Sequence, residues 1–354
     1  MTQAKSVSIN HRDIGTDCPP YICAEISANH NGKLERALEL ISQASDAGAD
    51  AVKIQTYRPD TITLKSLKPE FQISSGLWAG RTLYDLYEEA HLPWEWHHEL
   101  FQFAREKQIT LFSSPFDHTA VDFLESLDAP AYKIASFEIV DTELIRYAAS
   151  TQKPLIISTG LASADDISRA LEAANGVGND QLVILHCVSA YPASPSDYNL
   201  RTLTDKQTRF RSLVGLSDHT ISNTTAIASV CLGSVFIEKH FTLDRQGGGP
   251  DDSFSLEPDD LRNLVRETRI AWDALGKVDY GLKSGETNNQ QFRRSLYFVS
   301  DLPEGSVIRE TDIKSVRPGH GLPAFEYRNV VGQTLTRDAE RHTPVTESHI
   351  RPVN

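Results

Sequence analysis

Eight short apolar segments recur along the first three quarters of the chain, and the gaps between them carry helical patterns. The apolar segments are 21–27, 51–57, 109–116, 131–136, 153–159, 181–189, 213–219 and 235–241. Strands that alternate with helices pair in parallel through right-handed crossovers. Eight such units within about 275 residues predict a closed (β/α)8 TIM barrel. A doubly wound open sheet is the alternative, but no Gly-x-Gly-x-x-Gly pattern follows the first strand to support it.

The pattern changes after Leu275. Residues 276–291 are polar and contain several glycines, which is typical of a linker. Residues 292–354 alternate short apolar segments with turn residues, which predicts a small β-rich domain. Because a domain of about 60 residues is marginal alone, we expect it to dock on the barrel or on a partner subunit. The predicted organisation is a barrel at 1–275, a linker at 276–291 and a small domain at 292–354.

The charge and the apolar runs exclude some classes of function. The 354 residues carry a net charge of -13, and nucleic-acid binding needs a basic face. A small anionic substrate needs only a few local lysines, so it is not excluded. No run approaches the roughly 18 apolar residues that cross a membrane, and the first residues lack the apolar core of a signal peptide. We therefore expect a cytoplasmic protein without nucleic-acid or membrane partners.

The four cysteines do not form a recognisable framework. Cys23, Cys187 and Cys231 lie in apolar segments, Cys18 lies apart, and no Cys-x-x-Cys pair occurs. This pattern predicts reduced core residues rather than disulfides or a zinc site.

Polar and ionisable residues gather at the ends of the predicted strands. They are Glu25, Lys53, Gln55, Ser113, Ser114, Lys133, Ser136, Glu138, Ser158, Thr159, His186, Ser189, Tyr191, Ser217, Asp218, His219, Glu238, Lys239 and His240. One polar residue at a strand end usually marks the point where the strand leaves the core. In a barrel, however, all these ends meet at the face that carries the chemistry. Eight polar ends together therefore predict a pocket at that face.

The residue types in this pocket indicate an anion site and a metal. Lys53 and Lys133 would be costly within apolar strands unless an anion or a carboxylate pairs with them. Hydroxyl groups beside the lysines suit phosphate and carboxylate oxygens. His219 and His240 close adjacent strands, so their rings can converge on one divalent metal. Two hydrogen-bonded histidines without a metal are the alternative.

Three further features have two interpretations each. The glycine-rich segment 244–252 suits closure over a substrate, but it can also be a flexible turn. The aromatic residues of 76–96 either form a hydrophobic lid or line a sugar site; they are Trp78, Tyr84, Tyr87, Trp94 and Trp96. Arg317, within the segment RPGHG, either belongs to a surface turn or reaches toward a site.

A set of motifs resembles the sialic acid synthases over almost the whole chain, from about Tyr21 to the end. The motifs are AEISANHNG, GADAVKIQTY, SSPFD, YKIAS, STG, GLSDHT, EKHFTLDR, SLEP and RPGHG. The resemblance implies a (β/α)8 barrel followed by an antifreeze-like (SAF) domain. It also implies condensation of phosphoenolpyruvate with an N-acylated amino sugar, with Mn²⁺ or Mg²⁺ as cofactor. Finally, it implies a domain-swapped homodimer in which the small domain caps the partner's site.

Within this family, two segments are most similar to the pseudaminic acid synthases. These are TLYDLYEEAHLPWEW and DDSFSLEP, and residues 28–32 read ANHNG where N-acetylneuraminate synthases usually read VNHNG. The acceptor of that branch is 2,4-diacetamido-2,4,6-trideoxy-β-L-altropyranose, and the products are pseudaminic acid and phosphate. N-acetylneuraminate and legionaminate synthases are the alternatives.

The resemblance also implies roles for individual residues. Phosphoenolpyruvate would be bound by Lys53, Lys133, Ser136, Ser158, Ser189 and Ser217, with Ser114 as a further substrate-binding residue. The metal would be held by His219 and His240. The sugar would face Glu25, Gln55, Tyr191, Asp251 and Arg317. Glu138 would act as acid and base, and Glu25, Lys133 and Asp251 are also expected to take part in catalysis, with Asp252 as a one-residue alternative to Asp251.

Two other functions compete with this one. A Schiff-base aldolase also uses a barrel lysine, but it needs neither metal nor phosphoenolpyruvate. A non-catalytic sugar-binding protein is the second rival. The number of ionisable groups around one small ligand argues against a binder.

Overall fold

The computed structural model describes residues 6–350 and divides the chain into two compact units, Met1–Gly276 and Lys277–Asn354. In the first unit, eight parallel strands close into a barrel in the order β10-β3-β4-β5-β6-β7-β8-β9. The strands are β3 Tyr21–Glu25, β4 Ala51–Thr56, β5 Thr110–Pro115, β6 Tyr132–Ile134, β7 Leu155–Ser158, β8 Leu182–Cys187, β9 Leu213–Asp218 and β10 Phe236–His240. Each lies inside one of the eight apolar segments, so the predicted (β/α)8 barrel is confirmed.

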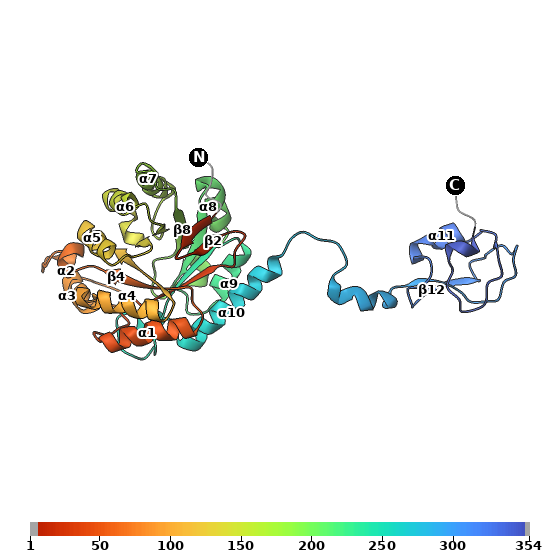
Figure 1. Cartoon of the computed structure of the whole chain (residues 1–354), viewed down its shortest axis with the longest axis horizontal. Helices are drawn as coiled ribbons and strands as arrows, with labels where there is room; N and C mark the ends of the chain where they lie inside the picture. Colours follow the sequence, from red (N-terminus) through yellow and green to blue (C-terminus); the bar gives the residue numbers. More distant parts are fainter. Residues whose placement is uncertain (1–5, 351–354) are drawn as a thin grey trace. The chain divides into compact units, whose positions relative to one another are not determined.

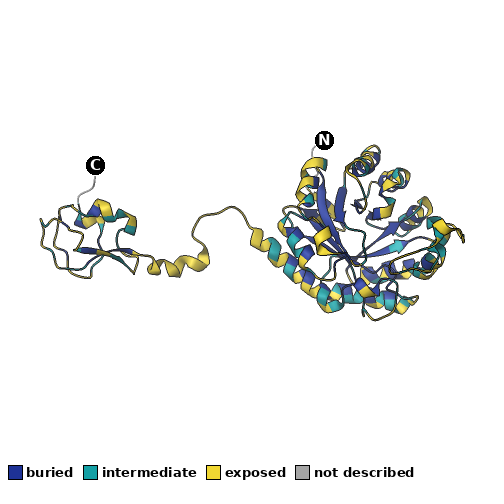
Figure 2. Cartoon of the chain, turned by 180° about the vertical axis from the view of Figure 1, so that it is seen from behind, coloured by how far each residue is buried: buried dark blue, intermediate teal, exposed yellow. Residues whose placement is uncertain are grey.

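Eight helices surround the barrel on its outer side (Figure 1). They are α1 Leu34–Asp46, α4 His97–Glu106, α5 His118–Ser126, α6 Thr142–Ser150, α7 Ala164–Asn175, α8 Thr202–Phe210, α9 Thr224–Cys231 and α10 Pro258–Leu275. Three begin at a side chain that accepts a backbone N–H of the first turn, namely Asp117, Asp141 and Ser163. Their inner faces are buried and their outer faces exposed (Figure 2).

Two apolar layers hold the first unit together. The larger layer lies between the strands and the helices, and the smaller one fills the barrel with residues such as Tyr21, Phe112, Leu185 and Phe236. Because successive side chains of a strand point to opposite faces, every second residue of each strand points into the barrel. The same alternation that directs Phe236 inward also directs Glu238 and His240 inward, near the C-terminal end of β10.

A hairpin closes the other end of the barrel. Strands β1 Ser6–Ile9 and β2 Arg12–Gly15 pair in antiparallel fashion. Their apolar residues join the interior layer of the barrel. The turn places Asn10 and His11 at positive φ, as a two-residue hairpin turn of type I′ requires. The apolar pattern did not predict this hairpin, because each strand has only four residues and the turn lacks an Asn-Gly or Asp-Gly signal.

Residues 58–92 form an insertion between β4 and the helices that follow it, and we call it the lid segment. It contains α2 Pro59–Ile62, the short 3-10 helix Pro69–Phe71 and α3 Leu83–Ala90. The Thr82 hydroxyl caps α3 by accepting from the Asp85 N–H. A further 3-10 helix, Trp94–Trp96, leads into α4.

The second unit has a small core of its own. Strands β11 Ser295–Phe298 and β12 Ile313–Val316 pair in antiparallel fashion, α11 Tyr327–Val330 follows, and Leu296, Phe298 and Val330 lie in the core. The unit has fewer strands than a β-rich domain suggests. Several pairings are single bridges, and two of these involve Pro323 and Pro344. Proline cannot donate to a ladder, so the pairing stops there.

The segment predicted as a linker, 276–291, overlaps a 3-10 helix, Ser284–Phe292. The Glu286 carboxylate accepts the Lys283 N–H at 3.0 Å, which caps its first turn. No residue of this helix is buried (Figure 2). Because this helix buries no side chain, the local hydrogen bond at its first turn is the interaction that supports it.

One cysteine prediction is wrong. Cys23 and Cys187 are buried, but Cys231 is exposed. Cys231 is the last residue of α9, whose buried face consists of Thr225, Ala226, Ser229 and Val230. Within residues 6–350, no helix is long and apolar enough to cross a membrane.

Candidate active site

A cavity of about 560 Å³ opens at the C-terminal ends of the strands. Twelve of the predicted site residues line it: Glu25, Lys53, Gln55, Lys133, Ser136, Glu138, Ser158, Tyr191, Ser217, His219, His240 and Asp251. Ser114 is buried beside it, with its Oγ 3.5 Å from Lys53 Nζ. Ser189 adjoins Gly160 near the same floor. Arg317 belongs to the second unit.

The floor of the cavity is a buried cluster of two lysines and two carboxylates. Lys53 Nζ lies 3.1 Å from Glu25 Oε2 and 3.3 Å from Glu238 Oε1. Lys133 Nζ lies 3.3 Å from the same Glu238 oxygen. The Ser217 hydroxyl also donates to this oxygen, at 3.3 Å. One carboxylate oxygen of Glu238, on β10, thus contacts side chains from three other strands, β4, β6 and β9.

The barrel register brings these groups together. Glu25 of β3 lies opposite His240 of β10 and opposite Lys53 of β4. Glu238 of β10 lies opposite Ser217 of β9. These pairings place the charged groups near the C-terminal ends of their strands, and these ends meet at one face of the barrel.

The lysines decide the charge of Glu238. Burial alone would raise the pKa of Glu238, but Lys133 and Lys53 lower it to about 2. Burial acts against the charge of Lys53 as well, yet Glu238 and Glu25 raise the pKa of that ammonium above its usual value. Burial raises the pKa of Glu25 and lowers the pKa of Lys133. Lys53 and Glu238 are therefore charged at neutral pH and largely neutralise each other.

Hydroxyl groups surround Gly160 next to this cluster, and we call Ser136, Ser158 and Ser189 the hydroxyl cradle. The Gly160 N–H donates to Ser136 Oγ at 3.1 Å. The hydroxyls of Ser158 and Ser189 are buried and have no hydrogen-bond partner. A buried hydroxyl without a partner is costly, so these two groups indicate the place of a ligand oxygen. A Cβ at Gly160 would come within 2.2 Å of Ser189 Oγ and would close the cradle.

Glu138 lies above the cluster, in the 3-10 helix Ser136–Val140 that follows β6. Its Oε2 atom is buried and has no hydrogen-bond partner. Burial raises the pKa of Glu138 to about 7. A carboxyl with such a pKa can both hold and release a proton near neutral pH.

The histidines lie side by side at the edge of the cavity, with ring centroids 5.4 Å apart. His219 Nδ1 lies 2.7 Å from the Val188 carbonyl oxygen, which can only accept, so Nδ1 carries a proton, and Nε2 offers a lone pair when the ring is neutral. Burial acts against the charge of His219, but Cys187 and the Val188 carbonyl raise its pKa above the usual value. His240 Nδ1 is buried without a hydrogen-bond partner and lies 3.9 Å from Asp251 Oδ2. Burial lowers the pKa of His240 well below its usual value, so the ring is neutral.

These donors fit a divalent metal ion that keeps open positions. Neutral imidazoles are common metal ligands, and an N–H bound to a backbone carbonyl is the usual way to orient one. Across residues 6–350, no group of three or more His, Cys, Asp or Glu side chains is placed to hold a metal ion. The described part of the chain therefore offers two nitrogens, and the other positions of such an ion would be filled by substrate or water.

A chain of hydrogen bonds lines the wall of the cavity beside the histidines. Gln55 Nε2 donates to Glu25 Oε1 at 2.8 Å and to Ser27 Oγ at 3.0 Å. The Ser27 hydroxyl donates to Asp251 Oδ2 at 2.6 Å. The Tyr191 ring packs against His219, with centroids 4.4 Å apart. This wall presents amide, hydroxyl and carboxylate groups, which are the usual partners of sugar hydroxyl and amide groups.

Comparison with known proteins identifies the family. The NeuB family model matches residues 40–280, and the SAF domain model matches residues 293–351. The chain belongs to the NeuB family. It is 42% identical to the pseudaminic acid synthase of Campylobacter jejuni subsp. jejuni serotype O:23/36, over 96% of this chain and 99% of that protein.

Two further relatives belong to other branches. The N,N'-diacetyllegionaminic acid synthase of Legionella pneumophila is 36% identical over 95% of this chain and 96% of that protein. The solved N-acetylneuraminic acid synthetase of Leptospira borgpetersenii superposes with a TM-score of 0.73 at 29% identity. That match covers 81% of this chain and 96% of the solved one.

The lid segment closes one side of the cavity in this NeuB-family chain. It contributes the apolar side chains Ile62, Ile73, Trp78, Leu83, Leu86 and Tyr87. Of the aromatic residues considered above, only Trp78 and Tyr87 line the cavity. Trp94 stacks on Phe123 at 4.6 Å, and Trp96 packs its edge against His30. The aromatic segment is thus partly a wall of the cavity and partly ordinary core.

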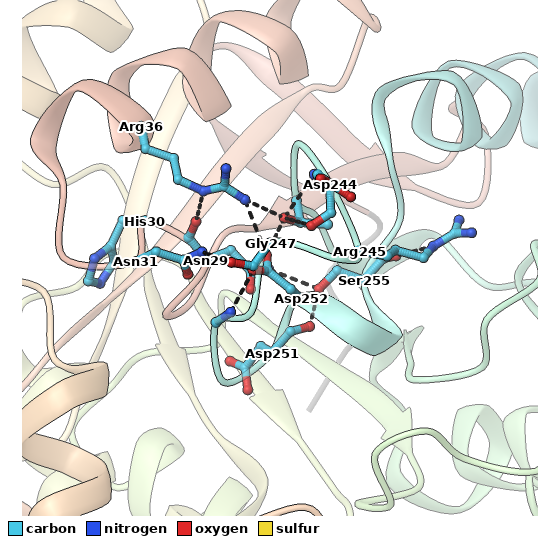
Figure 3. Close-up of polar contacts among 12 residues, drawn as sticks. Asn29, His30, Asn31, Arg36, Asp244, Arg245, Gly247, Asp251, Asp252 and Ser255 are labelled. Carbon is cyan, nitrogen blue, oxygen red and sulfur yellow. Dashed lines mark hydrogen bonds and ion pairs between the residues drawn. The ribbon is translucent and has the colours of Figure 1, made fainter.

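The glycine-rich loop, residues 244–252, follows β10 and is fastened to the loop after β3 (Figure 3). The Asp252 carboxylate accepts from Asn31 Nδ2 at 2.9 Å, from the Gly249 N–H at 2.8 Å and from the Thr242 hydroxyl. Arg36 of α1 pairs with it at 3.4 Å. Asp251 therefore faces the cavity, while its neighbour Asp252 anchors the loop.

Two NeuB-family site residues were missed as individual predictions, although both line the cavity. Glu238 lies two residues before His240 in one strand, so strand alternation directs both to the same face. That signal was present in the sequence. Ser27 follows β3 at a positive φ of 39°, and its orientation toward Asp251 depends on this turn. No sequence signal indicates it.

Proposed function

We propose that this protein is a pseudaminic acid synthase. It would condense phosphoenolpyruvate with 2,4-diacetamido-2,4,6-trideoxy-β-L-altropyranose and water to give pseudaminic acid and phosphate. The observation that carries the proposal is the buried Lys53–Glu238–Lys133 cluster, flanked by unpartnered hydroxyls and by two imidazoles. The 42% identity to a pseudaminic acid synthase over 96% of the chain supports the branch.

The anionic substrate would rest on the cluster and the hydroxyl cradle. Lys53 and Lys133 supply ammonium groups, and Ser158 and Ser189 supply hydroxyls without internal partners. Phosphate and carboxylate oxygens accept from such donors in charge-assisted hydrogen bonds. Ser136, Ser217 and Ser114 would complete the set. The exclusion of water in this buried site strengthens the attraction for the developing charge.

Glu138 would move the proton. In the proposed reaction, C3 of phosphoenolpyruvate forms a bond with the aldehyde carbon of the open-chain sugar, and water adds to C2. The Glu138 carboxylate accepts a proton from this water. The oxygen of the former aldehyde takes up a proton and becomes a hydroxyl group. The C2 hydroxyl then loses its proton as phosphate leaves by cleavage of its C–O bond, and C2 becomes a ketone. The raised pKa of about 7 supports this role, because Glu138 then exchanges its proton near working pH.

Mn²⁺ or Mg²⁺ bound by His219 and His240 would supply a Lewis acid for the aldehyde oxygen. The Val188 carbonyl keeps the His219 ring oriented, with Nε2 free. Glu25, Gln55, Tyr191 and Asp251 would hold the sugar, and Glu25 and Asp251 would also assist catalysis with Lys133.

The apolar lid supports a deoxygenated, N-acylated acceptor. Such a sugar carries three methyl groups, one at C6 and one on each acetamido group. Trp78, Leu83 and Tyr87 offer an apolar surface beside the polar wall. N-acetylmannosamine has more hydroxyls and only one methyl group, so it suits this surface less well. N-acetylneuraminate and legionaminate synthesis remain the alternatives.

We further propose the assembly that the family resemblance implies. A barrel at 1–275 and a SAF domain at 292–354 would be joined by the segment 276–291. The protein would form a domain-swapped homodimer, in which Arg317 of one subunit reaches the sugar in the other.

The first experiment measures phosphate release. The protein is stripped with EDTA, Mn²⁺ is added back, and phosphoenolpyruvate is offered with each candidate sugar. We expect metal-dependent release with the diacetamido-trideoxy-altrose only. Release with N-acetylmannosamine, or with the legionaminate precursor, would keep the reaction and change the branch.

The same experiment separates the two rivals. A Schiff-base aldolase would keep its activity in EDTA, and borohydride would trap its lysine with a carbonyl substrate. A sugar-binding protein would bind the sugar, but it would release no phosphate under any condition.

A further inference from the structure

Lys206 is a buried ammonium that the proposed reaction does not use. It lies on α8 with only 6% of its surface exposed. Its Nζ donates to the Thr159 hydroxyl and to His186 Nδ1, the latter at 3.0 Å. Thr159 follows the end of β7 and His186 is in β8, so the ammonium lies between the barrel and the helices.

The protons of this group can be assigned. The Tyr198 carbonyl can only accept, so His186 Nε2 carries the proton and Nδ1 accepts from Lys206. The Thr159 hydroxyl donates to the Leu185 carbonyl at 2.8 Å and therefore accepts from Lys206. Lys206 thus donates to two neutral groups, and neither balances its charge.

A second buried lysine in the same layer shows the contrast. Lys239 of β10 lies 2.8 Å from the Asp218 carboxylate and also donates to the carbonyls of Thr220 and Ser222. For Lys206, no ion pair with a carboxylate exists within residues 6–350. A buried charge without a counter-charge destabilises a fold. Burial accordingly lowers the pKa of Lys206 to about 8, which leaves the ammonium mostly protonated at neutral pH.

The position of this charge explains what it can do. Thr159 is followed directly by Gly160, whose N–H binds Ser136 of the hydroxyl cradle. Within the cavity, the charges of Lys53 and Lys133 are offset by Glu25 and Glu238. A ligand with several negative charges would therefore find little net positive charge at the floor itself. Lys206 adds one positive charge directly behind the cradle, where buried charges are weakly screened.

We propose that Lys206 is a positioning residue of the hydroxyl cradle, which holds the Thr159–Gly160 turn and attracts the anionic group that binds there. The inference rests on the proposed function only for the identity of that anion, phosphoenolpyruvate. The counter-charge that Lys206 lacks is supplied by the bound ligand.

The test compares Lys206→Met, Lys206→Arg and the control Arg209→Met. Arg209 lies on the same helix in an exposed pair with Asp205, so its loss removes a cation without touching the cradle. Binding of phosphoenolpyruvate is measured by calorimetry, and thermal stabilisation by inorganic phosphate is measured without turnover. We expect Kd for phosphoenolpyruvate to rise about tenfold in Lys206→Met, because the variant removes one weakly screened positive charge from behind the cradle.

The remaining readouts separate a positioning role from a structural one. Lys206→Met should keep the wild-type KM for the sugar and a melting temperature at or above that of the wild type, since an unpaired buried charge is removed. Lys206→Arg should retain anion binding, and Arg209→Met should resemble the wild type. If Lys206→Met does not fold, Lys206→Gln carries the test, because its amide still donates one hydrogen bond without the charge.

Two outcomes would overturn the inference. One is unchanged binding of phosphoenolpyruvate and phosphate in a folded, uncharged variant. The other is a lower melting temperature with equal loss of affinity for both substrates, which is the behaviour of a structural residue. Failure of the proposed function would look different, because the wild type itself would then release no phosphate while the phosphate-binding comparison could still be made.

Discussion

At the scale of single residues, Glu238 is the centre of the site. It accepts from Ser217 and joins the two lysines with one oxygen, while its second oxygen has no hydrogen-bond partner. Together with Glu25, which pairs with Lys53, this carboxylate offsets the charge of the two ammonium groups in the free protein. When an anion arrives, the lysines can share their hydrogen bonds with it. Glu238 therefore stabilises the free protein by pairing with the lysines, and it weakens anion binding because it competes with the anion for the same ammonium groups.

We expect Glu238→Gln to lower the free energy of unfolding by about 3 kcal/mol, because it leaves two buried ammonium groups without their shared partner. Inorganic phosphate should stabilise this variant more than the wild type, since the anion replaces the lost charge. Thermal melts with and without phosphate measure both effects. Equal stabilisation by phosphate in the two proteins would show that the lysines do not bind anions.

Glu138→Gln should lower kcat by a factor of about 10² to 10⁴. In the wild type, kcat/KM should rise as the pH increases through about 7, because the Glu138 carboxylate accepts the proton. The variant should lack this inflection. A pH–rate profile that is unchanged in Glu138→Gln would remove Glu138 from the reaction.

The same residue predicts a change in stability with pH. Its folded pKa of about 7 exceeds the ordinary value of 4.5, so the folded state binds the proton more tightly. The stability from this proton is fully present below pH 4.5 and is lost as the pH rises through about 7. Glu138→Gln does not titrate, so it should gain up to about 3 kcal/mol over the wild type between pH 5 and pH 8. Urea titrations at both pH values measure the gain.

At the scale of elements, the glycine-rich loop is the least regular part of the site and the most heavily fastened. Asp252 is 1% exposed. Its carboxylate accepts hydrogen bonds from Gly249 within the loop, from Thr242 just before the loop and from Asn31 in the loop after β3. Trp78 of the lid donates to the Pro250 carbonyl at 3.2 Å. The loop thus connects the β3 end of the barrel to the lid, with Asp251 between them.

Asp252→Ala should free this loop and raise KM for the sugar several-fold, with little change in KM for phosphoenolpyruvate. Trypsin cleavage after Arg245, which lies in the same loop, should become faster. Asp259→Ala is the matched control, because that carboxylate is 91% exposed and forms only a surface pair with Arg262. Unchanged proteolysis in Asp252→Ala would show that the anchor is not needed.

At the scale of the whole molecule, the two units have separate cores. The core of the second unit includes Leu296, Phe298 and Val330, and it is small. Arg317 is the one residue of this unit that the resemblance assigns to the sugar. Whether it serves its own barrel or that of a partner is a question of assembly, and a mixing experiment answers it.

We expect co-expressed His240→Ala and Arg317→Ala chains to recover about a quarter of the wild-type activity, although each alone is inactive. In a swapped dimer, half of the mixed assemblies are heterodimers, and each of these has one intact site. Phosphate release from the purified mixture measures the recovery. No recovery, with dimers present, would mean that Arg317 serves its own barrel, whereas an Arg317→Ala chain that is active by itself would mean that Arg317 serves neither site.

The sequence alone determined the order and type of the barrel elements. Apolar segments of strand length alternate with helical periods, and this local pattern reflects burial directly. It also placed most of the charged residues at one face, because strand alternation and a closed parallel barrel leave few alternatives. Glu238 was named among the polar strand ends without a role of its own, and its direction into the pocket follows from its spacing to His240.

The tertiary structure alone decided which of these residues lie in contact and which of them are protonated. The distance from Lys53 to Glu238, the pKa of Glu138 near 7 and the lone pair of His219 depend on neighbours from other strands. Asp251 faces the cavity and Asp252 anchors the loop because each accepts a hydrogen bond from a residue more than 200 positions away in the chain. These donors are Ser27 and Asn31. Lys206 is the extreme case, since only the packing of α8 on the barrel buries it and leaves it without a carboxylate partner among the described residues. Local sequence reports burial and periodicity, whereas ionisation and side-chain pairing arise from contacts that the fold brings together.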